Sequence, residues 1–157
     1  MIKRRYLIVI LLAILFIKCD SKIALGFNEN ASINKLGDLP ENPFEFNAIN
    51  TSLHPQNQTI TILYGNQLAY NYARLTGDKS YPTKSILYCV TWQSQADEQW
   101  FGANISGKIL KIERIEILEN SKTKYEQFNS QGKKIRISDG FVKRIHAIKL
   151  MRMAVSP

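Results

Sequence analysis

The stretch SILYCVTW, residues 85–92, decides the expected fold. It is apolar at nearly every position and rich in β-branched and aromatic residues, which predicts a strand buried on both faces. A second strand is predicted over Thr59–Tyr64, where Ile60 and Ile62 alternate with threonines and share one face. Because two such strands cannot bury their apolar side chains alone, they imply a sheet packed around a core.

Weaker strand patterns follow these two. Lys108–Leu118 is predicted to be a strand whose alternation changes phase, and a bulge near Glu113 and Arg114 would account for the change. Lys133–Ile137 is predicted to be a short edge strand, where lysines are common. No internal repeat divides the chain, so its 157 residues fit one domain of ordinary size.

Two segments have helical patterns. A short amphipathic helix is predicted over Gln67–Thr76, with Asn66 as its N-terminal cap. The segment Phe141–Val155 fits both a helix capped by Ser138 or Asp139 and an alternating strand, and we favour the helix. The expected fold is therefore mainly β (α+β), a single domain with a curled antiparallel sheet and one or two short helices.

The first nineteen residues have the layout of an export signal. Three basic residues, 3–5, precede an uninterrupted apolar stretch from Tyr6 to Ile17. These residues are fewer than the roughly 20 that a membrane-spanning helix needs. Cys19 stands where a bacterial lipoprotein signal places its lipidated residue. Because the bulky cation Lys18 precedes it, cleavage further along the chain or an uncleaved anchor remains the alternative.

The chain is accordingly divided into three parts. Residues 1–19 are a predicted signal peptide, residues 20–42 a flexible tether rich in Asn, Ser, Gly and Lys, and residues 43–157 the folded domain. The expected location is the periplasm or the membrane surface, reached through a lipid on Cys19 or through the N-terminal segment. Nucleic acid is not an expected partner of an exported protein.

Charge is spread unevenly along the chain. The formal net charge is +8, and the stretch from Ser121 to Pro157 holds nine Lys and Arg residues against two acidic ones. A basic C-terminal quarter fits either a solvated face, which we favour, or contact with anionic lipid headgroups or an acidic partner.

Residue types that commonly act in catalysis or bind metals are sparse. The chain has two cysteines, Cys19 and Cys89, and two histidines, His54 and His146, with no CxxC or CxxCH. No local metal site and no catalytic set is therefore expected. Three carboxylates are interpreted as turn or surface charges because no nucleophile and base accompany them: Asp97, Glu98 and Glu113.

The connection QADEQWFGANI, residues 95–105, places two aromatic residues beside a glycine. Taken alone, it suggests an exposed aromatic binding loop. Between two predicted strands, Trp100 and Phe101 are instead expected to fold back onto the core, with Gly102 allowing the backbone turn.

Five short motifs stand in a distinctive order: Leu63-Tyr64-Gly65-Asn66, Tyr81-Pro82, Val90-Thr91-Trp92, Trp100-Phe101-Gly102-Ala103 preceded by Asp97, and Ile112-Glu113. In this order the chain resembles the cytochrome P-460 family, and more specifically a branch of cell-envelope proteins that carry the domain. The resemblance covers roughly Leu53–Pro157, and the aromatic and glycine motif is its most specific part.

The resemblance implies a mainly β fold and a tendency to form homodimers. The haem-bearing members act on hydroxylamine or nitric oxide, attach a c-type haem through CxxCH near the C-terminus, and cross-link a lysine to the haem edge. Here the C-terminal stretch HAIKLMRMAVSP has no cysteine, so covalent c-type attachment is excluded. Cys89 stands where the cross-linking lysine is expected, and Lys84 where the family has a glycine.

Two functions of different classes follow. The first is a non-catalytic binding domain of the cell envelope that keeps the fold and its pocket. The alternative is a redox or sensing protein that holds haem non-covalently, with His54 or His146 as axial ligand or Cys89 in that role. The missing CxxCH favours the first. The residues expected to line a pocket are Tyr81, Cys89, Trp92 and Trp100.

Overall fold

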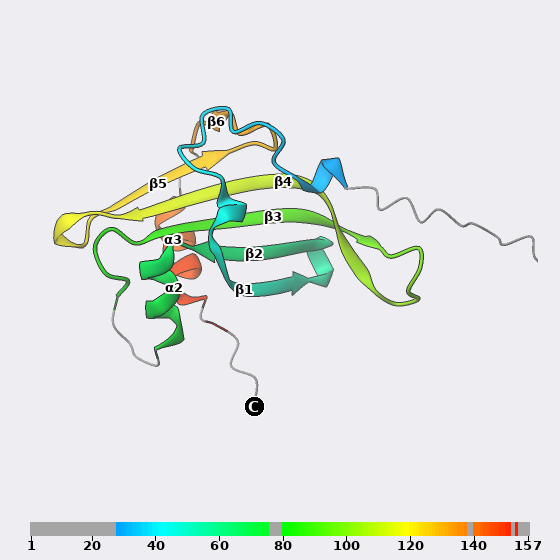
Figure 1. The fold of residues 1–157 in the computed structure, drawn as a ribbon, viewed down its shortest axis with the longest axis horizontal. Helices are drawn as coiled ribbons and strands as arrows, with labels where there is room; N and C mark the ends of the chain where they lie inside the picture. Colours follow the sequence, from blue (N-terminus) through cyan, green and yellow to red (C-terminus); the bar gives the residue numbers. More distant parts are fainter. Residues whose placement is uncertain (1–27, 76–79, 138–139, 152, 154–157) are drawn as a thin grey trace, which may run out of the picture.

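The computed structural model describes residues 28–75, 80–137, 140–151 and 153. Its centre is one six-stranded antiparallel sheet in which each strand pairs with the next along the chain (Figure 1). The predicted mainly β single domain, with an antiparallel sheet and two short helices, is confirmed. The strands are β1 (Asn47–His54), β2 (Thr59–Gly65), β3 (Ile86–Ala96), β4 (Asn104–Ile117), β5 (Thr123–Phe128) and β6 (Lys134–Ile135).

Strand β3 lies between β2 and β4 and is buried on both faces, as its sequence predicts. Leu87 and Cys89 belong to the core on one face of the sheet. Tyr88 and Val90 alternate with them and belong to the core on the other. All four are fully buried, so each face of the sheet needs a cover of its own.

Two helices cover one face (Figure 1). Helix α2 (Gln67–Arg74) begins where the sequence predicts, because the Asn66 side chain accepts the Ala69 N–H at 3.0 Å. Helix α3 (Phe141–Leu150) confirms the helical interpretation of its segment, but its N-terminal cap is Gly140 and not Ser138 or Asp139, which lie outside the described residues. The buried residues of this face are Ile49, Leu63, Ala69, Ala73, Tyr81, Leu87, Cys89, Ile115, Ile117, Tyr125 and Ile148.

The other face is covered by residues 28–46, here called the N-terminal arm. The arm contains two single-turn helices, η1 (Glu29–Ala31) and η2 (Pro43–Glu45). Leu39 is buried against the sheet, and the Trp92 indole N–H donates to the Ala31 carbonyl at 2.9 Å. The predicted domain boundary at residue 43 is therefore too late, because part of the expected tether packs as the cover of the second face.

The pairing of β3 with β4 shifts register twice, and the shift nearer the middle of β4 leaves a bulge at Leu110, earlier than predicted. Trp92 pairs with Ile109 and its neighbour Thr91 pairs with Lys111, so Leu110 is left out of the pairing and is exposed. After the bulge, the alternation is regular to the end of the strand. Consecutive residues of β4 consequently face opposite covers.

The turn between β3 and β4 contradicts the expectation for its aromatic residues. Trp100 and Phe101 do not fold back onto the core: their relative exposures are 70% and 109%. The reason is that β3 and β4 continue as a paired hairpin to Ala96 and Asn104, which carries the turn beyond the sheet (Figure 1). Gly102, with φ of 82°, takes part in that turn as expected.

The predicted signal peptide, Cys19 and the first part of the predicted tether lie outside the described residues. Among the residues that the structure describes, no helix is long and apolar enough to cross a membrane.

The arm is held against the β5–β6 turn by a close backbone approach, which yields the first prediction. Gly132 has φ of 73°, and a Cβ there would overlap the Leu36 carbonyl oxygen. We expect Gly132→Ala to lower the free energy of unfolding by about 3 kcal/mol, since backbone strain and steric overlap add. Urea denaturation measures the change.

Gly102→Ala is the matched control. Gly102 also has a positive φ, 82°, but no atom lies within 4 Å of the added Cβ. Only the backbone strain of about 1 kcal/mol is then expected. Equal losses in the two variants would contradict the proposed contact between arm and turn.

Candidate functional site

The most unusual side chain of the sheet is a fully buried carboxylate, Glu113 of β4. It accepts hydrogen bonds from the Tyr125 hydroxyl at 2.6 Å and from the Arg144 guanidinium, whose shortest contact is 2.6 Å. The Lys111 ammonium lies 3.2 Å away. A buried charge is tolerated only when it is paired and hydrogen-bonded, and these three donors meet that requirement.

The elements explain why these groups meet. Glu113 lies opposite Cys89 of β3 and Gln127 of β5, and all three face the helices. Helix α3 brings Arg144 over the same part of the sheet, where its Nε and one terminal nitrogen donate to the two carboxylate oxygens of Glu113. Arg144 is one helical turn before the buried Ile148, so both lie on the inward side of α3.

Electrostatics keep this cluster ionised. Burial alone would raise the pKa of Glu113, but hydrogen bonds from Arg144 and Tyr125 lower that pKa below its usual value. Burial and the hydrogen bond to Glu113 raise the pKa of Tyr125. The hydrogen bonds to Glu113 likewise raise the pKa of Arg144. At neutral pH the cluster is therefore a carboxylate held by two cations and a phenol.

Cys89 lies at the inner wall of the cluster. Its Sγ atom is 3.4 Å from an Arg144 nitrogen, and the residue is fully buried. Burial, followed by the repulsion from Glu113, raises the pKa of the thiol to about 12. Because the thiolate is the nucleophilic and metal-binding form of cysteine, this thiol is not activated for either role at neutral pH.

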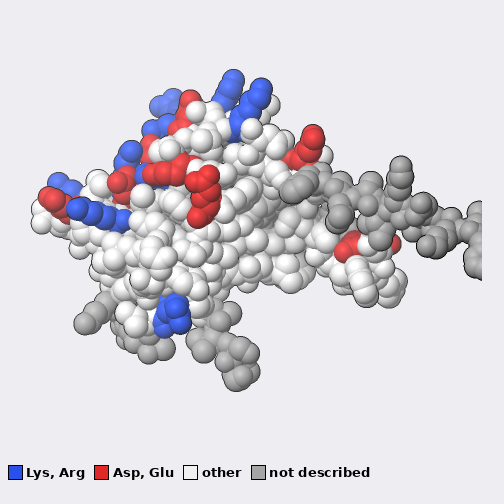
Figure 2. All heavy atoms as spheres, viewed as in Figure 1, with Lys and Arg blue, Asp and Glu red and all other residues white. Residues whose placement is uncertain are grey.

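A second charged cluster lies on the opposite face, under the arm. The Arg114 side chain is only 5% exposed and donates to the Glu41 carboxylate of the arm at 3.1 Å through two nitrogens. The Tyr88 hydroxyl donates to the same carboxylate at 2.5 Å, and Glu116 and Glu126 also pair with Arg114. Figure 2 shows charged side chains gathered over this part of the molecule. The cluster attaches the arm to the sheet.

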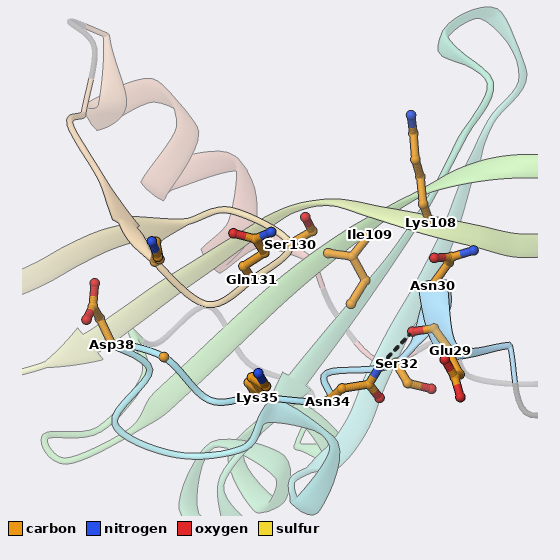
Figure 3. A pocket seen from close by; sticks show the side chains of 12 residues that line it. Glu29, Asn30, Ser32, Asn34, Lys35, Asp38, Lys108, Ile109, Ser130 and Gln131 are labelled. Carbon is orange, nitrogen blue, oxygen red and sulfur yellow. Dashed lines mark hydrogen bonds between the residues drawn. The ribbon is translucent and has the colours of Figure 1, made fainter.

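Beside this cluster the arm leaves a pocket of about 770 Å³ (Figure 3). Lys108 and Ile109 of β4 form one side, and the arm and the β5–β6 turn form the others. Three lysines and two carboxylates leave one net positive charge among hydroxyl and amide groups. The lining residues are Glu29, Asn30, Ser32, Asn34, Lys35, Gly37, Asp38, Lys108, Ile109, Ser130, Gln131 and Lys133.

The four residues expected to line one pocket do not converge. Tyr81 and Cys89 share the core under the helices, where the Tyr81 ring lies 4.7 Å from that of Tyr72. Trp92 is buried on the opposite face beneath the arm. Trp100 is exposed at the tip of the β3–β4 hairpin. The prediction of a common pocket is therefore wrong, because consecutive strand positions alternate between faces.

The residues considered as haem ligands do not fit that group. His146 lies on the exposed side of α3, and His54 lines a separate pocket of about 390 Å³ at the β1–β2 turn whose lining is mostly polar. A haem ligated by Cys89 would have to displace the Arg144 contact and the surrounding core. No step of a reaction is therefore derived through a haem.

The chain matches no protein-family model and no curated protein sequence. The cytochrome P-460 resemblance accordingly stays a prediction.

Sequence reasoning missed the roles of Glu113 and Arg144. The alternation of Ile115 and Ile117 already places Glu113 on their face of the strand, which is the signal of a buried carboxylate. The three-to-four-residue spacing of the helix places Arg144 with Ile148. What the sequence did not show is that these two faces pack against each other.

The lowered pKa of Glu113 predicts acid sensitivity. Because the unfolded carboxyl has the higher pKa, near 4.5, the unfolded chain takes up its proton first as the pH falls. The stabilisation from Glu113 is thus complete above about pH 5 and is lost as the pH falls through its folded pKa. We expect thermal denaturation between pH 7 and 3 to show a falling melting temperature below pH 5.

Glu113→Gln should reduce this slope without abolishing it, because the pKa values of Glu41 and Glu126 are also lowered. Glu98→Gln, at an exposed carboxylate of the hairpin, is the matched control and should keep the wild-type slope. A Glu113→Gln variant as acid-sensitive as the wild type would refute this account.

Proposed function

We propose that this chain is an exported, non-catalytic binding domain of the cytochrome P-460 type, which works in the bacterial cell envelope without covalent haem. It is held at the membrane by its N-terminal segment or by a lipid on Cys19. The support comes from the order of motifs between Leu53 and Pro157, from the mainly β fold with helices on one face, and from the chemistry of the Glu113 cluster. Homodimer formation stays a prediction of the same resemblance.

The absence of catalysis is supported by the surroundings of Cys89. By the resemblance to the cytochrome P-460 family, this residue stands at the position of the lysine that cross-links haem. Here its thiol is buried and in contact with Arg144, which is itself bound to Glu113. The Arg144–Glu113 ion pair therefore occupies the space next to Cys89. This arrangement leaves neither an activated nucleophile nor an open ligand position beside Cys89.

The binding role is supported by the pocket under the arm. Its volume of about 770 Å³ falls within the range of small-molecule sites, roughly 300–1,000 Å³. Ten of its twelve lining residues are polar or charged, so a hydrophilic ligand suits it. The three lysines outnumber the two carboxylates, which favours a ligand with an anionic group such as a carboxylate.

The absence of bound haem is tested by spectroscopy. The chain is produced with haem supplied, and its absorption spectrum is recorded after purification. We expect no stoichiometric Soret band, because His146 is exposed, His54 lines a pocket of mostly polar residues, and Cys89 is enclosed by the core.

A stoichiometric band would instead support the haem-dependent redox or sensing function. Its loss in only one of His54→Ala, His146→Ala and Cys89→Ala would then identify the ligand.

The pocket is tested with gluconate, a small polyhydroxylated carboxylate, and with glucose as its neutral counterpart. Calorimetry on the wild type should detect binding of gluconate but no binding of glucose. The double substitution Lys35→Ala with Lys133→Ala should raise the Kd for gluconate about tenfold or more. Tenfold corresponds to about 1.4 kcal/mol of binding free energy. Both side chains line the pocket.

Lys122→Ala with Lys143→Ala removes two exposed lysines outside the pocket and is the charge-matched control. Equal weakening in this control would show a general charge effect and would argue against the pocket. No gluconate binding would reject this ligand class.

A further inference from the structure

The β3–β4 hairpin presents the most exposed aromatic residues of the described chain. Trp100 and Phe101 are 70% and 109% exposed, and Ile105 beside them is 40% exposed. Tryptophan and phenylalanine side chains in soluble domains usually bury much of their surface, so two adjacent exposed ones at a protruding tip need a reason.

The tip is ordered by its own hydrogen bonds. The Asp97 carboxylate accepts the backbone N–H groups of Gln99 at 2.8 Å and Trp100 at 3.3 Å. The Ala103 N–H donates to the Trp100 carbonyl at 3.0 Å, and the Asp97 N–H donates to the Ala103 carbonyl at 3.0 Å. The turn thus holds the aromatic residues outward by local contacts, without support from the core.

The position of the hairpin suggests what covers it. The described chain begins at Asn28, at the same end of the sheet as the hairpin (Figure 1), and the Asn28 amide donates to the Ser106 carbonyl of β4 at 3.0 Å. Upstream of this point the sequence contains the apolar stretch Tyr6–Ile17. Ten residues separate that stretch from Asn28 and can span at most about 35 Å, so a membrane holding the stretch lies within reach of the hairpin.

We propose that the β3–β4 hairpin is a second membrane contact, whose Trp100 and Phe101 side chains enter the interfacial layer of the bilayer that holds the N-terminal segment. Aromatic residues favour this layer, because it accommodates an apolar ring and a polar N–H together. The proposal rests on the proposed membrane attachment and adds an orientation: the hairpin end of the sheet faces the lipid.

The chemistry of the tip defines the lipid surface that it fits. Residues 93–107 include no Lys or Arg, while Asp97 and Glu98 are acidic. The contact is therefore apolar and directed to zwitterionic lipid, since anionic headgroups would repel the tip. A protein partner would fit the same aromatic side chains, but only a membrane accounts for their location next to the chain that leads to the apolar stretch.

The test uses the two tryptophans of the full-length chain in phosphatidylcholine vesicles with brominated acyl chains, which quench nearby tryptophan emission. Trp92 is 3% exposed beneath the arm and serves as the internal reference. The Trp100 signal is the difference between the wild type and Trp100→Phe. We expect brominated lipid to at least halve the Trp100 signal, to leave Trp92 emission nearly unchanged, and to act no more strongly when anionic lipid is added.

The matched control moves the reporter. Trp100→Phe combined with Leu75→Trp places an exposed tryptophan after α2, where Leu75 is 68% exposed. This tryptophan should not be quenched. Equal quenching at both positions, or none at Trp100 while the chain stays with the vesicles, overturns the hairpin contact alone.

Two further outcomes also decide the matter. A chain that fails to remain with the vesicles overturns both the attachment and the hairpin contact. In the other outcome, Trp100 becomes less exposed to water as the protein density on the vesicles rises, while brominated lipid does not quench its emission. That result assigns the tip to a second copy of the chain and overturns the membrane contact.

Discussion

Two neighbouring residues of β4 carry opposite charges to opposite faces of the sheet. Glu113 faces the helices and binds Arg144 of α3, and Arg114 faces the arm and binds Glu41. The sheet is apolar on both sides, so each face needs a cover, and an arginine–glutamate pair links β4 to the cover on each face. The rest of the structure depends on this pair of contacts at the middle of one strand.

The two pairs contribute to position more than to net stability. Moving a carboxylate and a guanidinium out of water costs about as much as their attraction returns, and apolar side chains of similar volume would pack as well. An ion pair, however, requires its partner at one place and in one orientation. We interpret Glu113 and Arg114 as the residues that set where α3 and the arm dock.

The parts of the fold that could be predicted are those whose own sequence carries a strong pattern. Strands β2 and β3 and helix α2 were predictable because burial on both faces, or a cap followed by helical spacing, leaves a local signal. Strand β1 buries a single residue, Ile49, and β5 mixes Tyr125 and Phe128 with charged partners, so neither resembles a typical strand. The arm has no periodicity at all, because irregular chain can cover a sheet with a few well-placed apolar residues such as Leu39.

The candidate site was predictable to a smaller extent. Trp92 and Trp100, both singled out from the sequence, lie on one strand and its hairpin, yet Trp92 is buried beneath the arm and Trp100 is exposed at the hairpin tip. The charged cluster depends on contacts between segments separated by 31 residues, such as Glu113 and Arg144, which a pattern along one segment does not contain. The exposure of Trp100 depends on how far two strands stay paired, which residue types alone do not determine.

The arm also determines how the domain responds to mechanical force. A pull on the N-terminal side of the arm reaches the sheet through the arm and loads its contacts in order: first Asn28 on Ser106, then Ala31 on Trp92, and last Glu41 on Arg114. These contacts would open one after another, as in peeling, and the paired strands would carry the load only afterwards. The contacts of the N-terminal arm would therefore break before the strands of the sheet separate.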